Sequence, residues 1–133
     1  MKCGSVISSV GIYAPARLLT NSDFERILAA SNQDTSDEWI TTRTGIKLRH
    51  VAESHETVGS MAYEAIKDAL DGVRGISPIE HILLATNTHH RPFPNAVGEV
   101  QTMLRETRPD FVDVNASGSD VYSGCTGVNM ALM

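Results

Sequence analysis

Apolar residues recur along this chain in short runs, and their spacing separates expected helices from expected strands. The clearest helical pattern covers residues 57–70, where apolar side chains recur at intervals of three and four and so share one face. Asp71 and Gly72 follow and favour an end to this helix. The residues on the shared face are Val58, Met61, Ala62, Ala65, Ile66, Ala69 and Leu70.

Two shorter helices are predicted nearer the N-terminus, each opened by a run of capping residues. Residues 22–25 have the capping-box pattern and predict a helix that continues to Ala30. Residues 35–38 repeat the pattern and predict a second helix that carries Trp39 and ends at Gly45.

Apolar runs without helical spacing predict strands. We expect a buried strand at residues 6–13, extended chain at 46–51 and a buried parallel strand at 81–86.

The C-terminal third continues this alternation. Asn95 is expected to cap a helix that reaches Leu104. Short strands are predicted at 111–114 and 121–122, with a surface loop over the polar residues 115–119. Strands that alternate with helices predict an α/β fold.

Composition narrows the class of protein. The 133 residues make up one domain or part of one, and 41% of them are hydrophobic, which is enough for a packed core. A formal net charge of -5, with lysines and arginines scattered singly, disfavours nucleic-acid binding. No apolar run approaches the roughly 20 residues of a membrane span, so we expect no membrane insertion and a cytoplasmic location. Cys3 and Cys125 lie far apart and predict reduced thiols.

Cys125 is the candidate nucleophile. It lies in a run of small residues, 123–127, that leads into an apolar stretch, so we expect its thiol at a helix N-terminus. There the free backbone N–H groups and the positive end of the helix dipole favour the nucleophilic thiolate. The alternative is a buried, inert cysteine, and the residues alone leave both open. Because Met133 follows so soon, we expect any acid or base that acts with Cys125 to lie outside these residues.

Two other candidate sites depend on weaker patterns. The histidines show neither HExxH spacing nor a neighbouring cysteine pair, and the His89-His90 pair is expected in a loop, so we predict no metal site. Trp39 and Arg43 are four residues apart and share a helical face, where ring and guanidinium can stack on a purine. A tryptophan buried in the core beside a solvated arginine is the alternative interpretation.

Several motifs agree in order and spacing with one enzyme family. The most specific are Thr-Ser-Asp-Glu-Trp-Ile at 35–40 and Arg-Thr-Gly-Ile at 43–46, and the Phe93-Pro94 pair and the Cys125 turn also match. The whole chain therefore resembles the N-terminal part of β-ketoacyl-acyl-carrier-protein synthase III, the condensing enzyme that starts fatty-acid synthesis. The resemblance implies a thiolase-like fold, of which all 133 residues would form the incomplete N-terminal half of an αβαβα architecture.

The resemblance also implies a role for individual residues. Cys125 would accept the acyl group. Thr35, Trp39 and Arg43 would bind coenzyme A, and Phe93 would reach the acyl pocket across a homodimer.

The implied reaction transfers an acyl group from acyl-coenzyme A to the cysteine and then condenses it with malonyl-acyl carrier protein. Coenzyme A enters as part of the substrate, so no separate cofactor is implied. The family's catalytic histidine and asparagine belong to its C-terminal half, so we expect this chain alone to be inactive.

The chain departs from the family pattern at two places. The interval between Phe93 and Cys125 is longer than usual, with residues 111–119 as the additional material, and Val128 stands where an aromatic residue is common. Two alternatives stay open: a non-catalytic remnant or assembly module of the same fold, and a related condensing enzyme of secondary metabolism.

Overall fold

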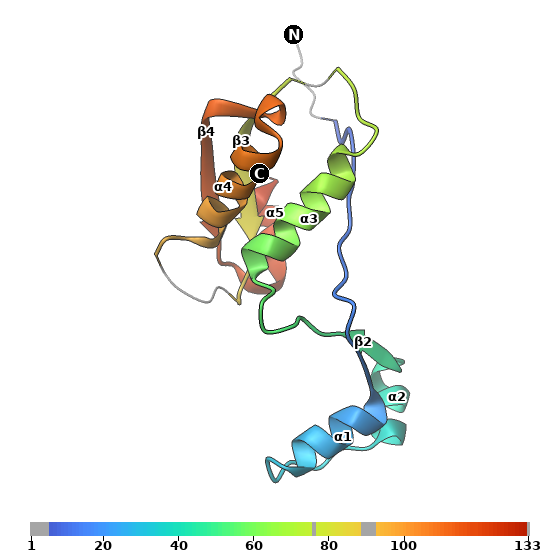
Figure 1. The fold of residues 1–133 in the computed structure, drawn as a ribbon. Coiled ribbons are helices and arrows are strands. Elements are labelled where there is room, and N and C mark those ends of the chain that lie inside the picture. The colour runs from blue at the N-terminus through green and yellow to red at the C-terminus, as the bar shows by residue number, and fades with distance from the viewer. Residues whose placement is uncertain (1–5, 76, 89–92, 133) are drawn as a thin grey trace. The chain divides into compact units, whose positions relative to one another are not determined.

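The computed structural model describes residues 6–75, 77–88 and 93–132, which form two compact units (Figure 1). The smaller unit is Ala14–His55, and the larger unit holds the described residues before and after it. The larger unit contains a parallel pair of strands, and the smaller unit contains an antiparallel pair.

Two of the sequence predictions fall on residues that the structure does not describe, namely Cys3 and the His89-His90 loop. Within the described ranges, no helix is long and apolar enough to cross a membrane. Nor do these ranges contain a group of three or more His, Cys, Asp and Glu side chains that could hold a metal ion.

The sheet of the larger unit pairs β3 (Ile79–Ala85) with β4 (Val112–Val121) in parallel. The prediction of a parallel strand at 81–86 is confirmed, although Ile82 is the one residue of β3 that is buried. β4 continues without a break through residues 115–119, so the prediction of a surface loop between two short strands is wrong.

β4 contains additional residues near its start. The register passes from the pair Ile79–Val112 to the pair His81–Ser117, so five steps along β4 match two along β3, and three residues are additional. Such a bulge bends the strand without ending it.

Hydrogen bonds hold this bulge in place. Asp113 Oδ1 accepts from the backbone N–H of Asn115 at 2.6 Å, and Gln101 Nε2 donates to the carbonyl of Ala116 at 3.1 Å. Residues 117–119 therefore pair with β3, whereas the additional residues before them are held by a side chain of β4 itself and by a side chain of α4.

Two helices cover one face of this sheet. α4 (Ala96–Thr107) packs on the strands, and α3 (Val58–Leu70) packs on α4. Thr57 caps α3 by accepting from the backbone N–H of Ser60 at 3.0 Å. Both helices confirm the sequence prediction. The buried core comprises Ile82, Val97, Val100, Leu104, Val112 and Ala116.

Residues 6–13 form no strand, which contradicts the sequence prediction. They run beside α3 (Figure 1), and their backbone is bound by that helix. Ile12 N–H donates to Asp68 Oδ2 at 2.8 Å, and the Ser9 hydroxyl donates to the carbonyl of Ala69. The apolar run suggested a strand, but this segment lies against helix α3, which accepts one bond from the backbone of Ile12 and one from the side chain of Ser9.

Gly11 allows this close approach. A Cβ atom at position 11 would lie 2.2 Å from the carbonyl oxygen of Ala65 and 2.2 Å from the nitrogen of Ala69. The apolar side chains of the segment do not enter the core, since Val6, Ile7, Val10 and Ile12 are between 77% and 87% exposed.

The smaller unit joins two helices to a short antiparallel pair of strands. β1 (Leu18–Thr20) pairs with β2 (Leu48–His50) in antiparallel fashion. Between them lie α1 (Asn21–Ala29) and α2 (Asp37–Thr44), as the sequence predicts.

The caps of these helices agree only in part with the prediction. Thr20, not Ser22, caps α1, and it forms a reciprocal capping box with Asp23. The predicted start is therefore two residues late, because the last residue of β1 also serves as the cap. Ser36 caps α2, and Gly45 ends it with a φ of 71°, a left-handed conformation that glycine adopts without strain.

Candidate functional site

Cys125 follows the ends of the two parallel strands. Just beyond them, Thr86 N–H donates to the carbonyl of Val121 at 3.1 Å. Asn87 Oδ1 then accepts from the backbone N–H of Gly124 at 3.1 Å, which fastens the loop after β3 to the residue before Cys125. In parallel sheets this edge is where loops converge and where α/β proteins place functional residues.

The thiol is carried by a 3-10 turn, η2 (Gly124–Thr126), and not by the first residue of a helix. α5 (Gly127–Ala131) begins two residues after the cysteine. The sequence predicted Cys125 at the start of this helix, so the predicted start is two residues too early. Gly124 has a φ of 53°, and this left-handed conformation turns the chain out of β4. Cys125 is free and exposed, in contrast to the buried, inert alternative.

Asp120 links the same edge of the sheet to α4. Its Oδ2 and Oδ1 accept from the backbone N–H groups of Ala96 at 2.8 Å and Val97 at 2.9 Å. Such first-turn groups have no partner within their own helix, and the positive helix end favours a carboxylate there. Asn95 occupies the capping position as predicted, but its side chain makes no capping hydrogen bond.

Tyr122 extends this arrangement toward the cysteine turn. Its hydroxyl donates to Asp120 Oδ2 at 2.8 Å. That hydrogen bond holds the phenolic proton against a carboxylate and raises the pKa of Tyr122 above its ordinary value of 10.0.

Sequence reasoning missed the structural roles of Asn87 and Asp120. The bond from Asp120 to Ala96 spans 24 residues, so no local pattern indicates it. For Asn87 a local signal exists, because a polar residue directly after an expected parallel strand lies at the edge where loops meet.

Trp39 and Arg43 lie together on the surface of the smaller unit. The guanidinium carbon of Arg43 is 4.9 Å from the centre of the Trp39 ring, and Trp39 is 54% exposed. With Ser36, Glu38 and Thr42, these residues line a surface pocket of about 430 Å³. An exposed aromatic face beside a guanidinium is suited to stacking on a planar base, and the exposure argues against a core role for this tryptophan.

The remaining predicted site residues lie outside this pocket and in different units. Thr35 is half-buried and directly precedes the cap of α2, but it does not line the pocket. Phe93 is 87% exposed and lies shortly before α4. The structure therefore brings Trp39 and Arg43 together within the smaller unit, whereas Cys125 and Phe93 belong to the larger one.

Comparisons with known proteins show which proteins this chain resembles in sequence and in fold. No protein-family model matches it. It is 42% identical over 130 residues to beta-ketoacyl-acyl-carrier-protein synthase III of Histophilus somni. The aligned region covers 96% of this chain and 37% of that protein. The crystal structure of the same enzyme from Thermus thermophilus superposes with a TM-score of 0.77 at 36% identity, over 96% of this chain and 36% of that chain.

A third relative is the priming beta-ketosynthase of the R1128 polyketide pathway, with a TM-score of 0.68 at 32% identity, over 93% of this chain and 34% of that chain. The chain thus spans a little over a third of the length of the relatives it matches. Its similarity to them extends over nearly all of its own residues and over both sequence and fold. Over nearly all of its own residues, this chain is therefore similar in sequence and in fold to beta-ketoacyl-acyl-carrier-protein synthase III, and over that share of its relatives' length it has their thiolase-like α/β fold.

Proposed function

We propose that this chain supplies the acyl-accepting cysteine and the coenzyme A-binding surface of a condensing enzyme that initiates fatty-acid synthesis. The observation that carries the proposal is the placement of Cys125. It is an exposed, free thiol in a turn that Asn87 fastens to the carboxyl edge of a parallel strand pair. The similarity to beta-ketoacyl-acyl-carrier-protein synthase III supports the same assignment.

The first step of the proposed reaction is a thioester exchange. The sulfur of Cys125 attacks the carbonyl carbon of acyl-coenzyme A, a new carbon–sulfur bond forms, and the bond to the coenzyme A sulfur breaks. The thiol proton leaves with coenzyme A, so that the products are an acyl-cysteine and free coenzyme A. Exposure of the thiol allows a substrate of this size to reach it.

The second step consumes the acyl-cysteine. Malonyl-acyl carrier protein loses carbon dioxide and its carbanion attacks the acyl carbonyl. The carbon–sulfur bond to the cysteine breaks, which leaves a β-ketoacyl-acyl carrier protein and the cysteine as a thiolate. In the family this step needs a histidine and an asparagine that have no counterpart in these 133 residues. We therefore propose that the chain by itself supports acylation without condensation, and that malonyl-acyl carrier protein and a homodimer partner belong to the complete reaction.

We propose further that Trp39 and Arg43 hold the nucleotide end of coenzyme A, with Thr35 along the cofactor path. The exposed ring and the guanidinium at 4.9 Å support stacking on adenine. Phe93, exposed shortly before α4, is proposed to contact the acyl pocket of a second copy. A cytoplasmic location is proposed on the thiol chemistry alone, since the reaction needs Cys125 reduced.

Labelling of the cysteine tests this proposal. The chain is incubated with acetyl-coenzyme A that carries a label in its acetyl group, and the labelled peptide is identified after proteolysis. We expect label on the peptide that contains Cys125, and none when Cys125 is replaced by alanine. Cys3→Ala is the matched control because it removes the other cysteine of the chain, and it should leave the labelling unchanged.

Two results would contradict the assignment. Label that survives Cys125→Ala would place the acyl group elsewhere. A chain that binds coenzyme A but is never acylated would favour the alternative of a non-catalytic module with the same fold. In parallel, carbon dioxide release from malonyl-acyl carrier protein is expected to stay at the level of the blank.

A related condensing enzyme of secondary metabolism is the second candidate, because the chain also resembles a polyketide priming ketosynthase at 32% identity. Both candidates use the same cysteine chemistry and differ in the acyl group that they accept. A panel of acyl-coenzyme A thioesters separates them. Acylation fastest with acetyl groups supports fatty-acid initiation, and a clear preference for longer or branched groups supports the second candidate.

A further inference from the structure

Asn21 has an unusual position in the smaller unit. It is 2% exposed and is the one buried polar residue of the chain's described part. Asn21 is the first residue of α1, yet the hydrogen bonds of its side chain go to residues outside this helix. A buried amide of this kind costs free energy unless its donors and acceptor are satisfied.

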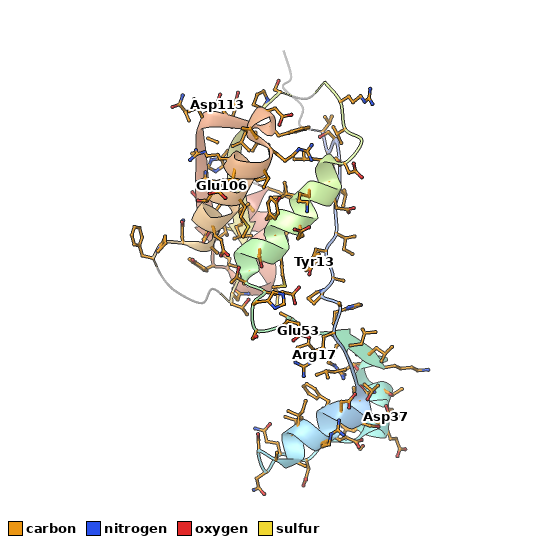
Figure 2. All side chains as sticks on the ribbon, viewed as in Figure 1. Tyr13, Arg17, Asp37, Glu53, Glu106 and Asp113 are labelled. Atoms are coloured by element: carbon orange, nitrogen blue, oxygen red, sulfur yellow. The ribbon has the colours of Figure 1, made fainter. Side chains whose placement is uncertain are left out.

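The amide of Asn21 contacts the start and the middle of α2 and the chain just beyond its end. Its Nδ2 donates to Oδ1 of Asp37 at 2.5 Å, to the hydroxyl of Thr41 at 3.2 Å and to the carbonyl of Ile46 at 2.9 Å. Asp37 is the first residue of α2 and is labelled in Figure 2. Ile46 follows Gly45, the residue that ends the helix, so one side chain binds the start, the middle and the exit of α2.

Arg49 fixes the orientation of this amide. Its Nη2 donates to Oδ1 of Asn21 at 2.8 Å, and its guanidinium lies 4.7 Å from the centre of the Phe24 ring. A reversed amide would direct its NH₂ group at a cation and its oxygen at the carboxylate of Asp37. The hydrogen-bond network therefore allows one orientation, in which the NH₂ group faces α2.

Helix α2 needs such support. It has eight residues, and isolated helices shorter than ~12–15 residues are marginal in water. Ile40 is its one buried residue, so apolar packing adds little. Trp39 and Arg43 are one turn apart and face each other only while the segment is helical.

We propose that Asn21 is a positioning residue for the coenzyme A-binding surface. It holds α2 in the helical conformation that brings Trp39 and Arg43 together, and it does so without touching the ligand. This inference rests on the proposed binding of coenzyme A at that pair, but the conformation of α2 can be measured without any ligand.

The test compares Asn21→Asp with an exchange variant, Asn21→Asp combined with Asp37→Asn. The single change places two carboxylates in contact and removes the donor to Ile46. The exchange restores one amide and one carboxylate across the contact between positions 21 and 37, with Arg49 still able to bind the carboxylate. The matched control is Asn32→Asp, the same substitution at an exposed asparagine of the same unit.

Hydrogen exchange of the ligand-free chain is the first measurement, and coenzyme A affinity by calorimetry is the second. We expect Asn21→Asp to lose protection in α2 more than in α1 and to weaken coenzyme A binding by about 10-fold or more, the scale for leaving buried polar groups unpaired. The exchange variant should recover the part of both losses that comes from the contact between positions 21 and 37, but not the part that comes from the lost donor to Ile46. Asn32→Asp should match the unchanged chain.

Three results bear on the inference differently. Unchanged protection of α2 in Asn21→Asp would overturn it. Protection lost equally from α1, α2 and the β1–β2 pair would also overturn it, since Asn21 would then be a general core residue. If the unchanged chain binds no coenzyme A, the proposed function of the surface fails, while selective loss and recovery of α2 protection still establish Asn21 as the residue that holds this helix.

Discussion

Exposure marks the residues that packing does not explain. Trp39 is 54% exposed and Cys125 is exposed, although both residue types are mostly buried in folded proteins. Leaving an aromatic side chain in water forgoes roughly 25 cal/mol for each Å² of apolar surface that could have been buried. A surface tryptophan beside an arginine therefore needs a reason other than stability, and ligand stacking is the reason that we propose.

The proposed stacking role of Trp39 gives a prediction at this scale. Trp39→Ala should weaken coenzyme A binding by about 1–3 kcal/mol, the range for the loss of one aromatic partner of a base. Trp39→Phe keeps a smaller ring at the same place, so its affinity for coenzyme A should lie between those of the unchanged chain and of Trp39→Ala. Calorimetric titration of the three chains measures the effect, because the substitutions remove the fluorophore. An unchanged dissociation constant in a folded Trp39→Ala chain would return this residue to a packing role.

At the scale of elements, β4 connects the helix layer to the candidate active site. Asp120 near its end caps α4, and Tyr122 binds the same carboxylate just before the cysteine turn. The start of α4 and the path toward Cys125 are therefore fixed by one side chain. This arrangement gives a short strand pair a defined edge on which an exposed thiol can be presented.

The capping role of Asp120 is testable against the residue that the sequence favours. Asp120→Ala should destabilise the larger unit by about 1–3 kcal/mol, because two backbone N–H groups of α4 lose a charged acceptor. Asn95→Ala should change stability by less than about 0.5 kcal/mol, because its side chain makes no capping bond. Hydrogen exchange of α4 amides reports on the larger unit, whereas Trp39 emission reports on the smaller one. Equal effects of the two substitutions would show that Asn95 does cap the helix in solution.

For the whole molecule, the exposed apolar side chains of the larger unit are the dominant feature. Val6, Ile7, Val10 and Ile12 extend along one segment, and Val128, Met130 and Leu132 are between 54% and 76% exposed in and after α5. Apolar surface of this extent is typical of regions that other polypeptide covers. Each side chain left in water weakens the case for a stable, isolated monomer.

Self-association is therefore expected of the chain when it is studied alone. Its solution mass by light scattering should exceed that of one copy and should rise with concentration. Val10→Ser combined with Ile12→Ser should reduce the association, because both side chains are exposed and contribute nothing to the core. The matched control, Glu80→Ser, changes an exposed charged residue and should not reduce it. A chain that stays monomeric and unfolds cooperatively would contradict this prediction, because the exposed apolar side chains would then not cause association.

The sequence determined the elements whose signals are local. The helix at Val58–Leu70 follows from apolar spacing, and α2 follows from the capping run at 35–38 and from Gly45 at its end. The pairing of Trp39 with Arg43 follows from helical geometry over four residues. Local motifs also indicated the family, because the strings at 35–40 and 43–46 are contiguous and specific.

Tertiary structure decided whatever depends on partners distant in sequence. The run 6–13 has the composition of a strand but lies against α3, because pairing depends on which backbone is nearby and not on the run itself. Residues 115–119 look like a loop, yet they remain in β4. Residues 117–119 pair with β3, and the residues before them are held by side chains of β4 and α4. Asn21 and Asp120 appear as ordinary polar residues in the sequence, and only the fold makes one a clamp on α2 and the other the cap of α4. Hydrogen-bond partners many residues apart are brought together by packing, and no local sequence pattern indicates which residues will pack together.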